Sequence, residues 1–176
     1  AKGALMGHEL EAIAESIVAD DNGILAADES TGTIKKRFDA IGVESTEESR
    51  RAYRNLLFTT PGFEEFVGGV ILYDETIRQS ADDGTPFAEL LASKGVVPGI
   101  KVDTGAKPLA GAPGETVTEG LDGLRERLAE YYELGARFAK WRATLSVGDR
   151  LPSRYCVRVN AQALARYAAL CQEAGI

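Results

Sequence analysis

Four short apolar runs constrain the fold of this chain more than any other feature of its sequence. They cover residues 23–28, 66–73, 96–102 and 138–145. The first run, Gly-Ile-Leu-Ala-Ala-Asp, is nearly continuous in apolar residues, as expected of a strand buried on both faces. Segments with helical periodicity follow each run. Strands that alternate with helices predict βαβ units and a parallel sheet.

Apolar residues at helical spacing, such as Leu10 and Ile13, predict the segments between the strands to be helices. Ser45 or Thr46 can cap one of these helices at its N-terminus. The stretch 104–118 is rich in Gly, Pro and Thr and is expected to be a loop. The expected helices cover residues 5–20, 33–41, 46–59, 86–94, 119–134 and 159–174.

Two α/β architectures fit four strand–helix units. A (β/α)8 barrel takes about 250 residues, so a chain of 176 residues predicts the N-terminal half of a TIM barrel. We therefore expect residues 1–176 to be one incomplete barrel domain that continues beyond Ile176. The alternative is a complete four-stranded doubly wound sheet. Its phosphate loop is missing, because residues 27–33 (ADESTGT) match neither GxGxxG nor GxxxxGK[ST].

Composition excludes several functional classes. The net charge is -7, and no long basic run offsets it, so we expect no binding to nucleic acid. The sequence lacks a long apolar span, so we expect no membrane attachment. One histidine and two separated cysteines cannot supply a usual zinc site. Cys156 and Cys171 form no disulfide framework, which fits a reducing cytoplasm.

Charged residues gather where the predicted strands end. They are Asp28 on the first strand, Lys101 and Asp103 on the third, and Lys140 and Arg142 on the fourth. Residues two apart on a strand share a face, so these side chains can meet at the carboxyl edge of the sheet, where active sites of parallel α/β proteins form. A desolvated lysine there can act as a nucleophile or a proton donor. A structural ion pair, for example between Asp28 and Lys140, is the alternative.

Further polar residues follow the first strand. Ser30, Thr31 and Thr33 carry hydroxyls that can cap a helix or hold a phosphate group. For most of the arginines in this region, a solvated helix face is the simpler interpretation. These arginines are Arg37, Arg50, Arg51 and Arg54.

Several phrases of the sequence resemble class I fructose-bisphosphate aldolases, and the resemblance covers essentially the whole chain in the same order. They include residues 24–32 (ILAADESTG), 68–72 (GGVIL), 99–103 (GIKVD), 108–111 (PLAG), 120–124 (GLDGL), 138–142 (FAKWR), and 160–168 with Asn160-Ala161 and Leu164-Ala165-Arg166-Tyr167-Ala168.

The resemblance implies a cytoplasmic (β/α)8 barrel that reversibly cleaves fructose 1,6-bisphosphate in glycolysis. The products are dihydroxyacetone phosphate and glyceraldehyde 3-phosphate. The reaction runs through a lysine Schiff base, without a metal or other cofactor, and the full-length protein is expected to be a homotetramer. By resemblance, the catalytic residues are Asp28, Lys140 and Lys101. The residues that bind the sugar phosphate are Arg37, Arg50, Lys140, Arg142, Ser30 and Thr33.

The family pattern places the imine-forming lysine on the sixth strand and the proton-transferring glutamates on the fifth, both beyond Ile176. We therefore expect this chain alone to be catalytically inactive. Two other functions remain open. The chain could be a non-catalytic half barrel that binds sugar phosphates, or a Schiff-base enzyme that uses Lys140 itself as nucleophile.

Overall fold

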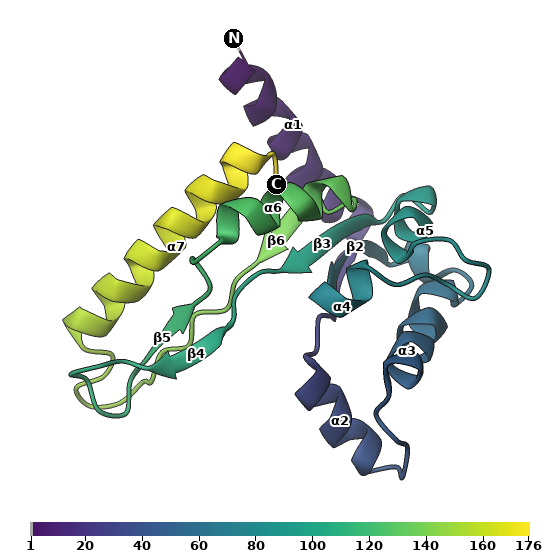
Figure 1. The fold of residues 1–176 in the computed structure, drawn as a ribbon. Helices are drawn as coiled ribbons and strands as arrows, with labels where there is room; N and C mark the ends of the chain where they lie inside the picture. The colour runs from purple at the N-terminus through teal and green to yellow at the C-terminus, as the bar shows by residue number, and fades with distance from the viewer. Residues whose placement is uncertain (1) are drawn as a thin grey trace.

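A four-stranded parallel sheet forms the centre of the fold (Figure 1). The computed structural model describes residues 2–176. The strands lie in the order β1 (Gly23–Ala27), β2 (Val67–Leu72), β3 (Val97–Lys101) and β6 (Phe138–Lys140). Every neighbouring pair is parallel, so all four carboxyl ends meet at one edge. The predicted alternation of parallel strands with helices is confirmed.

Helices connect the strands and cover the sheet. The helices before β2 are α1 (Lys2–Ile17), α2 (Thr31–Asp39) and α3 (Glu47–Thr59), and those after it are α4 (Asp74–Ile77), α5 (Phe87–Ser93), α6 (Leu124–Glu133) and α7 (Arg154–Ala174). Single 3-10 turns lie at Ala19–Asp21 and Phe63–Glu65. One hydrophobic core joins the sheet to α5, α6 and α7 through Val70, Leu72, Ile100, Phe87, Leu91, Leu124, Leu128 and Cys171. None of the described helices is long and apolar enough to cross a bilayer.

The region expected to be a loop at 104–118 is the main error of the sequence-based prediction. It forms an antiparallel hairpin of β4 (Gly105–Pro108) and β5 (Thr116–Glu119). Figure 1 shows this hairpin reaching away from the sheet, with α7 running beside it. Because β5 extends to Glu119, the following helix begins at Leu124 instead of residue 119. The helix α4 was not predicted.

Side chains far apart in the sequence explain why the hairpin forms. Asn160 on α7 accepts the backbone N–H of Thr118 at 3.3 Å and donates to the carbonyl of Thr116 at 2.9 Å. It thereby forms hydrogen bonds with backbone N–H and C=O groups that would lack a partner on an edge strand. Glu115 accepts both the backbone N–H and the hydroxyl of Ser153, at 2.7 and 2.5 Å. Ser153 in turn caps α7, so this helix begins at Arg154, five residues earlier than predicted.

Two other boundaries concern the start of α3 and the end of the fourth strand, which ends five residues earlier than predicted. Thr46 caps α3 and accepts the N–H of Ser49 at 3.0 Å, which decides between the two predicted caps. The fourth strand ends at Lys140, because residues 141–145 have no strand partner.

Three glycines allow close packing on the sheet. A Cβ atom at Gly68 would lie 2.1 Å from the backbone oxygen of Ile17, where α1 ends. At Gly99 it would lie 2.3 Å from the ring of Phe138, and at Gly69 3.1 Å from the same ring. The Phe138 ring therefore lies over β2 and β3 at positions that only glycine leaves free.

We expect Gly99→Ala to lower the free energy of unfolding by about 1–3 kcal/mol, because the added methyl group overpacks the space beneath Phe138. Urea denaturation followed by circular dichroism measures this change. Gly23→Ala is the matched control on β1, where the nearest atom to the added Cβ lies at 4.0 Å. Phe138→Leu should rescue Gly99→Ala. Equal stability of the two glycine variants would contradict this packing.

Both cysteines are buried, and neither lines the cleft at the carboxyl ends of the parallel strands. Burial raises the pKa of the Cys156 thiol, and burial also raises the pKa of Cys171, to about 11. At pH 8 roughly one Cys171 in a thousand would be thiolate, the form that reacts. We expect neither cysteine to react with a disulfide reagent at pH 8 in the folded protein, and both to react in urea. Reactivity of Cys171 in the folded protein should rise only as the pH approaches 11. Rapid labelling of native protein at pH 8 would show that these thiols are accessible.

Candidate active site

The carboxyl ends of the strands open on one cleft of about 820 Å³. Asp28 follows β1, Lys101 ends β3, and Lys140 ends β6, with Arg142 just beyond it. All four line this cleft, as do Ser30, Thr33 and Asp103. The prediction that charged residues from separate strands share one space is therefore confirmed.

Asp28 and Lys140 form an ion pair between the two outer strands of the sheet. The Lys140 ammonium donates to Oδ2 of Asp28 at 2.5 Å. The Asp28 side chain is 8% exposed and the Lys140 side chain 30%. An ammonium group has three donors, and this bond uses one of them. The pair expected as a structural alternative therefore exists, and it leaves Lys140 able to contact a ligand in the cleft.

Lys101 is held by its own strand. Its ammonium donates to the backbone carbonyl of Asp103 at 2.8 Å and to the carboxylate of Asp103 at 3.0 Å. The same carboxylate accepts the backbone N–H of Gly105 at 3.1 Å and that of Arg142 at 3.2 Å. Asp103 is buried and thus joins the end of β3 to the start of β4 and to the segment after β6.

The guanidinium of Arg142 is exposed, while its backbone is fixed. Its N–H bonds to Asp103, and its carbonyl accepts the hydroxyl of Thr118 at 2.7 Å. In the part of the chain that the structure describes, no carboxylate forms a salt bridge with this guanidinium. It is a positioned cation at the cleft that can bind an anion.

Ser30 and Thr33 lie at the N-terminus of α2. The hydroxyl oxygen of Ser30 accepts the backbone N–H of Thr33 at 3.4 Å, and the two hydroxyl oxygens lie 3.2 Å apart. Ser30 therefore caps the helix, one of the two roles predicted for these hydroxyls. Because both residues line the cleft, their second role, holding a phosphate group, stays a prediction.

Arg37 and Arg50 do not line the cleft. Arg37 pairs with Glu29, which raises the pKa of Arg37. Arg50 is buried and donates two bonds of 2.7 Å to Glu75, and hydrogen bonding to this carboxylate raises the pKa of Arg50. Each guanidinium already has an anionic partner, and contact of either with substrate stays a prediction.

The solvated-face interpretation is wrong for part of α3. Arg50, Arg54 and Phe58 are its buried residues, spaced four apart on one face. Arg54 is 1% exposed, and it was not predicted as a site residue. Glu29, which lines the cleft and contacts both Arg37 and Arg54, was also missed. The apolar Phe58 four residues after Arg54 was the available signal that this face points inward.

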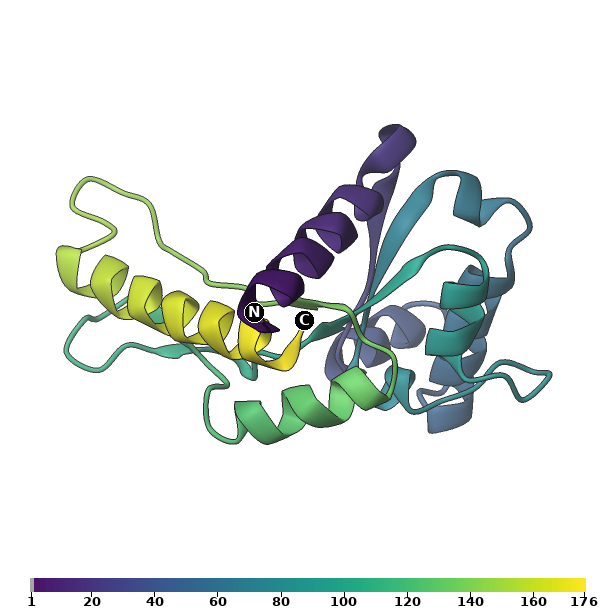
Figure 2. The ribbon, with the colours of Figure 1, turned by 90° about the horizontal axis from the view of Figure 1, so that it is seen from above.

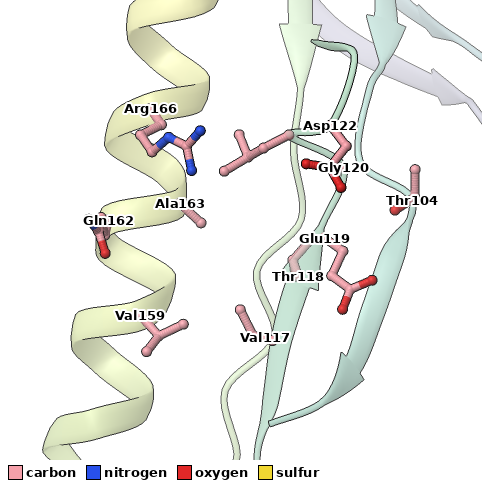
Figure 3. Close-up of a pocket in the computed structure, with 11 residues that line it drawn as sticks. Thr104, Val117, Thr118, Glu119, Gly120, Asp122, Val159, Gln162, Ala163 and Arg166 are labelled. Carbon is pink, nitrogen blue, oxygen red and sulfur yellow. The ribbon is translucent and has the colours of Figure 1, made fainter. Parts of the chain in front are cut away.

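A second cleft, of about 450 Å³, lies between β5 and α7. Figure 3 shows Val117 facing Val159 and Ala163 there, with Arg166 extending from the helix toward the strand side. Its charged residues are Glu119, Asp122 and Arg166, and none of the described lysines lines it. The strand-end cleft, with two lysines held by carboxylates, is therefore the candidate active site.

Comparison with known proteins identifies the family of this chain. The family model described as "Glycolytic: Fructose-bisphosphate aldolase class-I" matches residues 9–176. A probable fructose-bisphosphate aldolase class 1 of Xanthomonas campestris is 62% identical over 168 residues, which cover 96% of this chain and 50% of that protein. Fructose-bisphosphate aldolase C of Carassius auratus is 56% identical, with 96% and 47% covered.

A solved structure agrees in fold. Fructose-bisphosphate aldolase from Plasmodium falciparum, in a complex with TRAP and a small-molecule inhibitor, superposes with a TM-score of 0.95 at 46% sequence identity. The superposition covers 98% of this chain and 50% of that one. The chain thus spans about half the length of the relatives it matches, and its sheet corresponds to part of a TIM barrel. The expected architecture is confirmed, and the chain belongs to the class I fructose-bisphosphate aldolase family.

Proposed function

We propose that the protein carrying this chain reversibly cleaves fructose 1,6-bisphosphate to dihydroxyacetone phosphate and glyceraldehyde 3-phosphate. The observation that carries the proposal is the pair of Lys140 and Asp28 in the strand-end cleft, in a chain of the aldolase family. Residues 1–176 would be the first half of a barrel. The other half would supply the imine-forming lysine and the glutamates that transfer protons.

The reaction needs a cationic, preorganised site. The amine of the imine-forming lysine attacks the C2 ketone and water leaves, giving a protonated imine. The C4 hydroxyl then loses its proton, the C3–C4 bond breaks, and its electrons move to the imine as an enamine. The ammonium of Lys140, fixed by Asp28, can stabilise oxygen atoms that gain negative charge in these steps. Lys101, held by Asp103, adds positive charge beside it.

The two phosphates of the substrate need cations and hydrogen-bond donors. The guanidinium of Arg142, which has no carboxylate partner among the described residues, suits one of them. The hydroxyls of Ser30 and Thr33 lie at a helix N-terminus, which favours anions. Arg37 and Arg50 could serve as further phosphate contacts once Glu29 and Glu75 release them.

The setting of the whole protein belongs to the same proposal. We expect it to act in the cytoplasm as a homotetramer, without a cofactor or metal. One relative, of Arabidopsis thaliana, carries the name fructose-bisphosphate aldolase 6, cytosolic, and is 58% identical over 168 residues.

Substituting the ion pair tests the roles of its members. In the full-length protein, Lys140→Met or Asp28→Asn should lower kcat for fructose 1,6-bisphosphate by about 10²–10³-fold, the usual effect of removing one donor that stabilises developing negative charge. Lys107→Met, an exposed lysine on β4, is the control and should leave kcat unchanged. A coupled assay gives kcat, and thermal melts check folding. Near wild-type kcat in folded Lys140→Met would exclude the role proposed for Lys140.

Trapping with borohydride locates the nucleophile. The 176-residue chain, incubated with dihydroxyacetone phosphate and borohydride, should give no mass increase, and it should cleave no fructose 1,6-bisphosphate. The full-length protein should gain one reduced adduct, and peptide mapping should place it outside residues 1–176. An adduct on Lys140 or Lys101 would instead make this half barrel a Schiff-base enzyme in its own right.

A further inference from the structure

Arg54 is a buried cation directly behind the candidate active site. It lies on α3 and is 1% exposed. We infer that Arg54 is a positioning residue, which fixes the backbone on both sides of Asp28 and so aims the Asp28 carboxylate at Lys140. The catalytic consequence rests on the proposed aldol cleavage, whereas the geometric claim does not.

One guanidinium bonds to the two carbonyls that flank Asp28. Nε and Nη2 of Arg54 donate to the carbonyl of Ala27 at 3.3 and 3.2 Å. Nη2 also donates to the carbonyl of Glu29 at 2.8 Å. A planar guanidinium presents its donors in a fixed fork, so these bonds restrain the Ala27–Asp28 peptide group and the Glu29–Ser30 peptide group, which lie on the two sides of Asp28.

Asp28 needs such a restraint because it follows the last paired residue of β1. The register of β1 with β2 ends at the pair of Ala27 and Leu72. Past that point no strand ladder fixes the backbone, yet the Asp28 carboxylate must meet a lysine on β6 at 2.5 Å. The bonds from Arg54 replace the ladder at this position.

The charge of Arg54 makes a purely packing role a poor explanation. Burial lowers the pKa of Arg54, and the carboxylate of Glu29, 3.4 Å from Nη2, acts in the opposite direction. Glu29 is also paired with Arg37, so Arg54 shares this carboxylate. A buried, incompletely neutralised cation stabilises a fold less than an apolar side chain of similar size often would. What the arginine adds here is a donor fork that matches two carbonyls.

The first experiment measures the Asp28–Lys140 contact without using activity. Lysines of the full-length protein are acetylated at low reagent concentration, and peptide mass spectrometry gives the rate at each lysine. We expect Arg54→Lys to speed labelling of Lys140 about fivefold, equivalent to ~1 kcal/mol of ion pairing, and toward the rate in Asp28→Asn. Labelling of Lys101, which Asp103 holds, should not change. Arg51→Lys, on the same helix but paired at the surface with Glu48 and Asp82, should leave Lys140 unchanged.

The second experiment is a double-mutant cycle on kcat. Arg54→Lys should lower kcat for fructose 1,6-bisphosphate about tenfold or more, because small displacements of a catalytic group are costly. In the Asp28→Asn background the same substitution should cause no further loss, since its effect passes through Asp28. Additive losses, or unchanged Lys140 labelling in Arg54→Lys, would overturn the inference.

Failure of the proposed function can be distinguished from failure of the inference about Arg54, and so can variants that do not fold. If the wild-type protein cleaves no fructose 1,6-bisphosphate, the proposed function fails, and the labelling experiment alone decides the role of Arg54. If Arg54→Lys does not fold, Arg54→Gln takes its place. If neither variant folds, Arg54 is a residue that the fold requires, and the inference is overturned.

Discussion

The ion pair between Asp28 and Lys140 ties the geometry of the sheet to the chemistry of the cleft. These residues follow β1 and end β6, which are the first and last strands in the order β1-β2-β3-β6. In a flat sheet two strands three positions apart would lie ~14 Å from one another. Contact at 2.5 Å between their side chains therefore requires the strands to curve around a common axis. Figure 2, seen from above, shows the strands fanning out with their helices arranged around them. Curvature of this kind is what separates part of a barrel from an open doubly wound sheet.

Gathering charge at the mouth of such a sheet is costly unless each group has a partner. The chain provides these partners largely from its own backbone. Asp103 accepts N–H groups from two segments while it holds Lys101. Arg54 donates to the carbonyls beside Asp28. The lysines are thus fixed by groups that cannot move far, and Arg142, whose guanidinium has no carboxylate partner among the described residues, is a further cation available to a ligand.

Elements marked by a local apolar pattern could be predicted from the sequence. Contacts between residues far apart in the sequence could not. The strands were found because their apolar residues are consecutive, and most helices were found because theirs recur at helical spacing. The β4–β5 hairpin was missed because its strands have four residues each and contain Gly, Pro and Thr. What stabilises it is Asn160, more than forty residues later, in contact with Thr116 and Thr118. Glu115 and Ser153 explain the early start of α7 in the same way.

The residues of the candidate site also fall into those that a local pattern predicts and those that it does not. Asp28, Lys101, Lys140 and Arg142 were predictable to share a cleft, because the ends of parallel strands must meet and residues two apart share a face. The role of Arg54 was not predicted, since an arginine on a polar helix is normally solvated. Only the position of α3 against β1 reveals that its side chain points at backbone carbonyls. Arg37 and Arg50 are a third case, because their roles were implied by resemblance alone. The structure shows each of them paired with a glutamate.

The phrases that resembled the family also have a physical basis in this fold. In GGVIL and GIKVD, the glycines Gly69 and Gly99 leave the space into which Phe138, the first residue of FAKWR, inserts its ring. In ILAADESTG, the carboxylate of Asp28 meets Lys140 of that same FAKWR phrase. Each of these four phrases thus contains one side of a contact whose other side lies in another of them. A match in all of them, in order, specifies the contacts between strands as well as the strands themselves, which a match in any single phrase cannot do.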